Sequence, residues 1–325
     1  MLNGRFFLCE ICKMKSLFGF VLAVFILLVQ IGCKPLEQDS VAVAVGIRID
    51  EFLPEEQFRS DLKGLSEKKF QILQIELPLL ADSQTIFPKI NRTALFQLSK
   101  ILSQSEITPF QIQVMVTRTH LDQLFPAGKP DSLETWKHYY WQELKEILNR
   151  IPSNRMQIFW IGNDFQPIET EQEFWKTITD SVRKHPLHTN LKIGYAARTE
   201  RITNLPIWQY FDYIGIQNEI PADRNYKMYA KKHHTEISKF SDSLQKNIWI
   251  TNLNLLETDK LLQCKNSLRF WESKPISGIT VNTIYPITAI HDSVTRFGVA
   301  KRPDLIQFLQ KINHPAIQKT KESSK

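Results

Sequence analysis

The chain has 325 residues, of which 42% are hydrophobic and 23% are charged, and this composition is that of an ordinary globular protein rather than a disordered or fibrous one. The 41 lysines and arginines outnumber the 34 aspartates and glutamates, which gives a formal net charge of +7. The basic residues are spread along the chain, with a bias only between Lys311 and Lys325. We therefore expect no nucleic-acid partner, because nucleic-acid-binding domains concentrate their charge on one face or element.

The N-terminal segment has the pattern of an export sequence. Lys13 and Lys15 precede an apolar run from Leu17 to Ile31, and Gly32 and Cys33 follow it directly. A short basic start, an apolar stretch of signal-peptide length and a small residue beside a cysteine are typical of bacterial lipoproteins.

We therefore expect residues 1–32 to be a lipoprotein signal peptide and residues 33–40 to be the lipidated cysteine, Cys33, followed by a polar tether. Acyl chains on Cys33 would hold the protein on a membrane of the bacterial cell envelope, which is the outer membrane in a Gram-negative cell. An uncleaved signal anchor or a plain secretory peptide is the alternative, and Met14 is an alternative start of translation.

Beyond the tether, apolar runs alternate with amphipathic stretches. Several runs are continuously apolar, which is typical of parallel strands covered on both faces. The predicted strands are Val41–Ile49, Phe70–Leu77, Phe110–Val116, Met156–Ile161, Leu191–Ala196, Tyr213–Gln217, Ile248–Thr251 and Ile276–Val281.

The stretches between these strands carry helical periodicity. Apolar side chains recur at helical spacings in two of them, namely Trp136, Tyr140, Leu144 and Ile147 in one, and Phe174, Trp175, Ile178 and Val182 in the other. Thr170 and Glu173 have the spacing of a capping box and predict the start of the second helix.

Eight strand–helix units in about 270 residues match the count and length of an α/β barrel of the (β/α)8, or TIM-barrel, type. We expect residues 41–312 to form this barrel as a single domain, with a polar tail over residues 313–325. A doubly wound open sheet is the alternative. No GxGxxG or P-loop pattern follows any strand, so we expect no nucleotide or other cofactor.

In such a barrel, catalytic groups lie where the strands end and the following loops begin. The polar residues at these points are Asp50, Glu51, Glu76, Arg118, His120, Asn163, Asp164, Asn218, Glu219, Asn252 and Asn282. The set contains no spacing typical of metal ligands, so we expect no metal site. Carboxylates on separate strands are what glycoside hydrolysis requires, since one protonates the leaving oxygen and the other attacks or activates water. We interpret Glu51 and Glu169 as solvated loop residues or helix caps.

Four segments carry a family resemblance: Ile158-Phe-Trp-Ile-Gly-Asn-Asp164, Glu173-Phe-Trp175, Lys192-Ile-Gly-Tyr-Ala196 and Phe211-Asp-Tyr-Ile-Gly-Ile216. Together they resemble the central part of glycoside hydrolase family 113, a family of (β/α)8 β-mannanase-like retaining enzymes. The resemblance is good over residues 156–217 and weaker elsewhere. It implies a barrel with an acid/base glutamate after the fourth strand and a nucleophile after the seventh.

At both catalytic positions this chain departs from the family. The acid/base position matches Asp164, and the nucleophile position matches Asn252 in Ile248-Trp-Ile-Thr-Asn252. An amide cannot form a glycosyl ester, and an aspartate withdraws the proton donor by about 1 Å relative to a glutamate. These departures indicate a pseudoenzyme that binds a glycan or an envelope protein. The alternative is an active hydrolase in which Asp164 is the acid and Glu76 or Glu219 supplies a relocated carboxylate.

Other residues near the strand ends are candidates for ligand binding. Asn163, His120 and Arg118 could bind the hydroxyls of a glycan, and Tyr285, just past the last strand, is the best candidate for stacking on a sugar ring. Trp160, Trp208, Trp249 and Tyr195 either line a cleft or fill the layer between helices and strands, and we expect Trp208 to be core.

Overall fold

The computed structural model describes residues 42–48, 55–67, 70–81, 87–103, 110–118, 133–218, 235–240, 242–253, 276–281 and residue 307. All of them belong to one compact unit, Ser40–Lys325. Within this part of the chain, no helix is both long and apolar enough to span a membrane.

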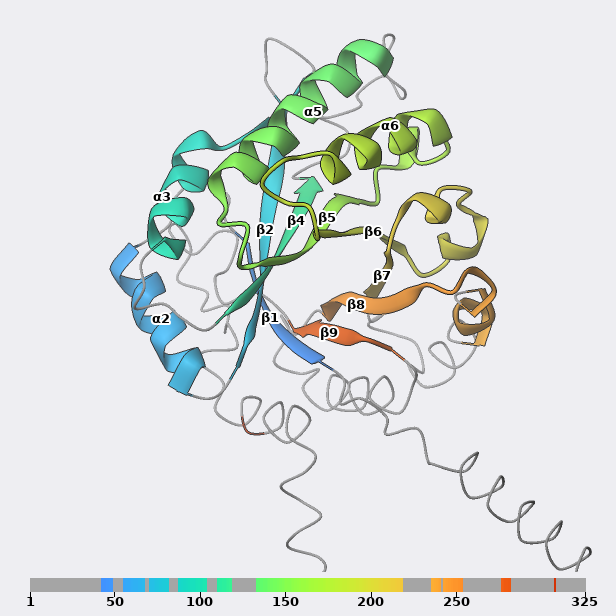
Figure 1. Cartoon of the computed structure of the whole chain (residues 1–325). Helices are drawn as coiled ribbons and strands as arrows, with labels where there is room; N and C mark the ends of the chain where they lie inside the picture. Colours follow the sequence, from blue (N-terminus) through green and yellow to red (C-terminus); the bar gives the residue numbers. More distant parts are fainter. Residues whose placement is uncertain are drawn as a thin grey trace, which may run out of the picture. The chain divides into compact units, whose positions relative to one another are not determined.

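Eight parallel strands form a closed barrel (Figure 1). They are β1 (Ala42–Arg48), β2 (Ile72–Ala81), β4 (Gln111–Arg118), β5 (Met156–Asn163), β6 (Lys192–Arg198), β7 (Tyr213–Asn218), β8 (Asn247–Leu253) and β9 (Gly278–Val281). Neighbouring strands pair in chain order, and β1 closes the ring by pairing with both β2 and β9. The predicted (β/α)8 barrel is confirmed, and the open-sheet alternative is wrong.

The barrel has one additional strand. The short strand β3 (Pro88–Ile90) pairs antiparallel with the last residues of β2, with Leu79 opposite Ile90. Pairing with β4 carries β2 to Leu79 and pairing with β3 carries it to Ala81, four residues beyond the predicted end of the strand at Leu77.

Helices cover the outside of the barrel (Figure 1). The described helices include α2 (Glu55–Glu67), α3 (Arg92–Leu102), α5 (Leu133–Arg150) and α6 (Gln172–Arg183), with short 3-10 turns η2 (Gln166–Ile168), η3 (Ile202–Asn204) and η4 (Trp208–Tyr210). Residues 235–240 and 242–244 are helical as well. Both predicted apolar stripes are buried, one on α5 and one on α6. The predicted capping box is wrong, because Glu171 rather than Thr170 precedes the first turn of α6 and makes no side-chain cap.

Side chains of the strands alternate between two apolar layers. On β2, for example, Leu73 and Ile75 belong to the large cluster between strands and helices. A smaller cluster fills the barrel interior and comprises Ala44, Met115, Ile158, Trp160, Ala196 and Trp249. Because both faces of each strand are buried, the strands appear in the sequence as continuous apolar runs.

Two tryptophans occupy the barrel interior because the neighbouring strand carries glycine at the position paired with each of them. A Cβ atom at Gly194 would lie 2.3 Å from Cε3 of Trp160, and one at Gly278 would lie 2.4 Å from Cη2 of Trp249. Each indole N–H also has a partner inside the barrel: that of Trp160 donates to Gln113 Oε1 at 3.0 Å, and that of Trp249 donates to a threonine hydroxyl at 2.9 Å. Because the glycines leave room and each indole N–H is hydrogen-bonded, two large rings can fill the barrel interior, which branched aliphatic residues commonly fill in this fold.

Candidate functional site

The candidate site lies where β5 ends, and a bulge in that strand positions it. The pairing of β5 with β6 shifts register between Trp160 and Asn163. The hydroxyl of Tyr140 donates to the Ile161 carbonyl within the bulge. Burial raises the pKa of Tyr140 well above its usual range, so the phenol stays protonated. The extra residue re-aims the chain, and Asn163 contacts the inward side chain of Met115, with 3.7 Å between Nδ2 and Sδ.

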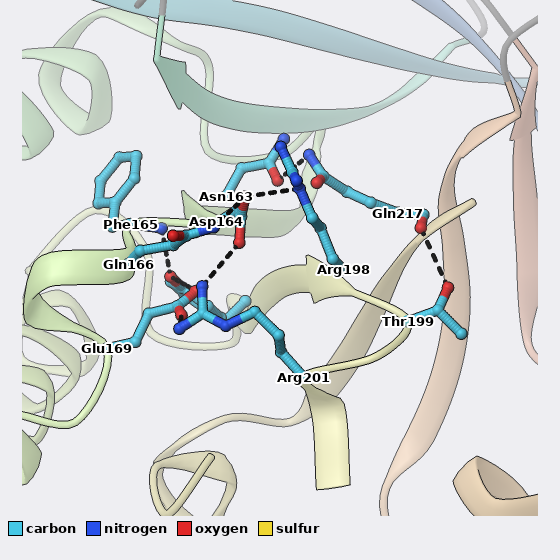
Figure 2. Close-up of polar contacts among 10 residues, drawn as sticks. Asn163, Asp164, Phe165, Gln166, Glu169, Arg198, Thr199, Arg201 and Gln217 are labelled. Carbon is cyan, nitrogen blue, oxygen red and sulfur yellow. Dashed lines mark hydrogen bonds and ion pairs between the residues drawn. The ribbon is translucent and has the colours of Figure 1, made fainter. Parts of the chain in front are cut away.

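Asp164 follows the strand in a left-handed backbone conformation, with φ of 54°. Its N–H still donates to the Ala196 carbonyl at 2.9 Å, and its side chain is only 1% exposed. Oδ1 lies 3.0 Å from Nη1 of Arg201, and Oδ2 lies 3.0 Å from Nε of Arg198 (Figure 2). Oδ2 also accepts a longer contact of 3.4 Å from Gln166. Both oxygens of this carboxylate are therefore engaged by the protein itself.

A second buried carboxylate, Glu169, joins the same cluster. Its Oε1 accepts a hydrogen bond of 2.6 Å from the hydroxyl of Tyr195, and its Oε2 pairs with Nη2 of Arg201. The Tyr195 oxygen accepts the N–H of Phe165 at 2.8 Å. Burial, and then the negative charge of Glu169, raise the pKa of Tyr195 well above its usual range, so its hydroxyl remains a donor.

We call Asp164, Glu169, Arg198 and Arg201 the arginine–carboxylate network. Two carboxylates and two guanidinium groups balance in charge, which makes burial of the carboxylates tolerable. Glu169 caps the C-terminal end of η2, as one of the two expectations has it, but the expectation of a solvated residue was wrong. The turn η2 folds Glu169 inward against β6, where Tyr195 and Arg201 meet it. No local pattern in the sequence connects these residues, because they come from the end of β6 and from the turns that follow β5 and β6.

Four consecutive strands end with polar residues around the mouth of the barrel. Gln217 donates from Nε2 to Asn163 Oδ1 (Figure 2). In the strand register Gln217 is paired with Arg198 on one side and with Asn252 on the other. The predicted nucleophile position, Asn252, therefore lies near the carboxyl end of β8, level with the other residues of this group.

The remaining predicted site residues fall in different places. Glu76 lies in the middle of β2 rather than at its end, because pairing with β4 and β3 prolongs the strand. It follows inward-facing Gln74 by two residues, so it lies on the same inner face of the strand, and it is nearly buried. Arg118 was predicted to follow a strand ending at Val116, and it is instead the last residue of β4. The other four, Cys33, His120, Glu219 and Tyr285, lie outside the described residues.

The aromatic residues near the strands are core. Trp160, Trp208, Trp249 and Tyr195 are all buried, as predicted for Trp208. The indole N–H of Trp208 donates to the carbonyl of Ile202 at 2.6 Å. None of these four rings is exposed for stacking on a sugar. In the described part of the chain, no three His, Cys, Asp or Glu side chains gather in a way that could hold a metal ion.

Comparison with known structures identifies the fold. A glycoside hydrolase family 113 β-1,4-mannanase matches with a TM-score of 0.66 at 11% identity, covering 85% of this chain and 98% of that one. The family 113 β-mannanase AaManA from Alicyclobacillus acidocaldarius, in complex with ManMIm, matches with a TM-score of 0.63 at 13% identity, covering 85% and 99%. The barrel is glycoside-hydrolase-like.

The likeness extends beyond family 113. Thermotoga maritima Cel5A, in complex with cellobiose, matches this glycoside-hydrolase-like barrel with a TM-score of 0.58 at 12% identity, covering 85% of this chain and 100% of that one. No protein-family model matches the sequence, and no curated protein matches it either. The shared fold confirms the architecture that the sequence resemblance implies.

Proposed function

We propose that this protein is a membrane-anchored lipoprotein whose glycoside-hydrolase-like barrel binds a glycan or an envelope protein without cleaving it. The observation that carries the non-catalytic part is the arginine–carboxylate network. At the position where family 113 has its acid/base residue, both oxygens of Asp164 contact arginines and the side chain is almost fully buried.

A general acid must bring a proton within hydrogen-bond reach of the leaving oxygen, at about 2.6–3.2 Å. The oxygens of Asp164 already face Arg198 and Arg201, so a glycosidic oxygen would have to displace a guanidinium group to reach them. Asn252 adds a second deficit, because an amide is no substitute for an ionised nucleophile. Losses at catalytic positions commonly remove several powers of ten in rate.

The test of this proposal is a turnover assay on the full chain purified in mild detergent. We expect no reducing ends above background from β-1,4-mannan or from β-glucans. Turnover that is lost in Asp164→Asn would instead support the alternative, an active hydrolase in which Asp164 is the acid. Separate Glu76→Gln and Glu219→Gln variants would then identify the second carboxylate.

The anchoring part of the proposal rests on the Gly32–Cys33 pair after the apolar run. Mass spectrometry of the membrane-extracted protein should find residues 1–32 absent and Cys33 acylated. The variant Cys33→Ala should leave the membrane fraction. An unchanged amount of this variant in membranes would contradict lipid anchoring.

A further inference from the structure

The barrel mouth between β5 and β7 is rich in hydrogen-bond donors. We call Asn163, Arg198 and Gln217 the donor arc, since they lie near the ends of three consecutive strands. Two of the three are amides, and the third is a guanidinium group. The carboxylate that adjoins them, Asp164, is buried and neutralised by arginines.

Arg198 is held from one side only. Its Nε contacts Asp164 Oδ2 at 3.0 Å, and within the described part of the chain its two terminal nitrogens have no partner. Its side chain is 45% exposed, whereas the carboxylate behind it is 1% exposed. A guanidinium group in this state presents its outer fork to solvent, and that fork matches the two oxygens of a carboxylate or phosphate.

The network behind Arg198 keeps this fork in place. Asp164 is itself fixed by Arg201, which also pairs with Glu169, so the aspartate cannot easily turn away from Arg198 (Figure 2). Holding a long side chain in its binding geometry reduces the entropy lost when a ligand binds. The buried network therefore has a use at the surface: it orients one exposed arginine.

A second observation points to a ligand at the same end of the barrel. The hydroxyl of Thr117, near the end of β4, is buried and has no hydrogen-bond partner among the described residues. Thr117 follows Met115 by two residues in β4, so both side chains lie on the face of the strand that points into the barrel. Met115 in turn contacts Asn163 of the donor arc. A buried hydroxyl without a partner is costly and commonly marks a position that a ligand or water completes.

We propose that the donor arc recognises an oxyanion carried by a glycan, the carboxylate of a uronate or a phosphate ester, with Arg198 as the anion-binding residue. The inference rests on the proposed glycan-binding function and names its ligand class. A neutral glycan could offer only uncharged acceptors to the outer nitrogens of Arg198, whereas an acidic one forms two charge-assisted hydrogen bonds with them.

The experiment compares ligands that share a backbone of β-1,4-linked sugars and differ in the neutral or anionic group that each sugar carries. Binding to the full chain in detergent is measured by calorimetry for the β-1,4-linked hexamers of mannose, of mannuronate and of phosphorylated mannose. We expect at least one acidic hexamer to bind about tenfold to a hundredfold more tightly than the neutral one, because a hydrogen bond to a charged group contributes that much. Which acidic hexamer binds distinguishes a carboxylate ligand from a phosphate ligand.

Variants assign the effect to Arg198. Arg198→Gln should abolish the preference for acidic hexamers, and Arg198→Lys, which keeps the charge but lacks the fork, should retain part of it. The matched control is Arg183→Gln, because Arg183 is 41% exposed and pairs with Asp212, which immediately precedes β7 and so lies at the other end of the barrel. Circular dichroism checks that each variant is folded. If Arg198→Gln is not folded, the comparison of Arg198→Lys with wild type is the test.

Three results would overturn the inference: equal binding of neutral and acidic hexamers, a preference that survives in Arg198→Gln, or no binding of any hexamer by folded protein. Hydrolysis of a bound hexamer would overturn the non-catalytic function and leave the role of Arg198 standing. The two proposals therefore fail in distinguishable ways.

Discussion

Replacement of Asp164 by asparagine separates a structural carboxylate from a catalytic one. Asparagine has nearly the same shape, and it is among the few residues that tolerate the left-handed conformation found here, with φ of 54°. The substitution therefore removes the charge and leaves the backbone undisturbed. If Asp164 serves to hold Arg198 and Arg201, the protein should lose stability.

The size of the loss follows from the exposure of the three groups. Removing one partner of a fully buried ion pair costs about 3–5 kcal/mol. Arg198 and Arg201 are 45% and 29% exposed, so water compensates part of their lost contact. We expect the free energy of unfolding to fall by about 2–3 kcal/mol. For a domain of this size, that lowers the melting temperature by about 3–5 °C.

The assay is chemical denaturation of wild type and variant at neutral pH, with melting temperature as a second measurement. Asp180→Asn is the matched control, because Asp180 lies partly exposed on α6 and should change stability by less than about 0.5 kcal/mol. Unchanged or increased stability of Asp164→Asn would refute the reasoning. Catalytic residues are often maintained at the expense of stability, so that result would indicate a catalytic rather than a structural carboxylate.

Three further predictions test the core and the pH response. Gly194→Ala should lower the free energy of unfolding by at least about 1–3 kcal/mol, because its Cβ would collide with Trp160, and the loss should shrink in a Trp160→Leu background. Tyr195→Phe should cost about 1–3 kcal/mol in the same denaturation assay, because a buried carboxylate loses a donor and a buried N–H loses its acceptor. Burial lowers the pKa of His185 and His188, so the unfolded chain binds more protons than the folded one below about pH 6.5. The free energy of unfolding should therefore fall as the pH drops from 7.5 to 5. A variant with both histidines changed to glutamine should show a weaker fall, and the same dependence of stability on pH in variant and wild type would contradict this.

The barrel could be predicted because each of its elements follows a simple rule. Strands buried on both faces appear as continuous apolar runs, and helices buried on one face appear as stripes such as that of α5. The short strand β3 was missed because three residues of Pro-Lys-Ile carry no periodicity. Its pairing with the end of β2 is a tertiary contact, and together with the pairing to β4 it places Glu76 in the middle of a strand.

The candidate site was harder to predict than the barrel. The sequence indicates that Asp164 follows a strand, but the direction of its side chain depends on a bulge and on a left-handed backbone angle. Glu169 has the local sequence of a loop residue, and its burial depends on Arg201 and Tyr195, which lie on the neighbouring strand and the turn after it. Ion pairs between turns are set by tertiary geometry, which spacing along the chain does not encode.

The same geometry argues that the two altered catalytic positions are coupled. Retaining hydrolysis needs two carboxylates about 5–5.5 Å apart, so Asn252→Glu alone would supply one of them while Asp164 stays bound to its arginines. Adding Asp164→Glu puts a longer side chain at a left-handed position that glutamate rarely adopts, still beside two guanidinium groups. We therefore expect the double variant to release no reducing ends from β-1,4-mannan above the wild-type level. Turnover by the double variant would show that the arginines yield readily to a substrate, and that Asn252 was the decisive loss.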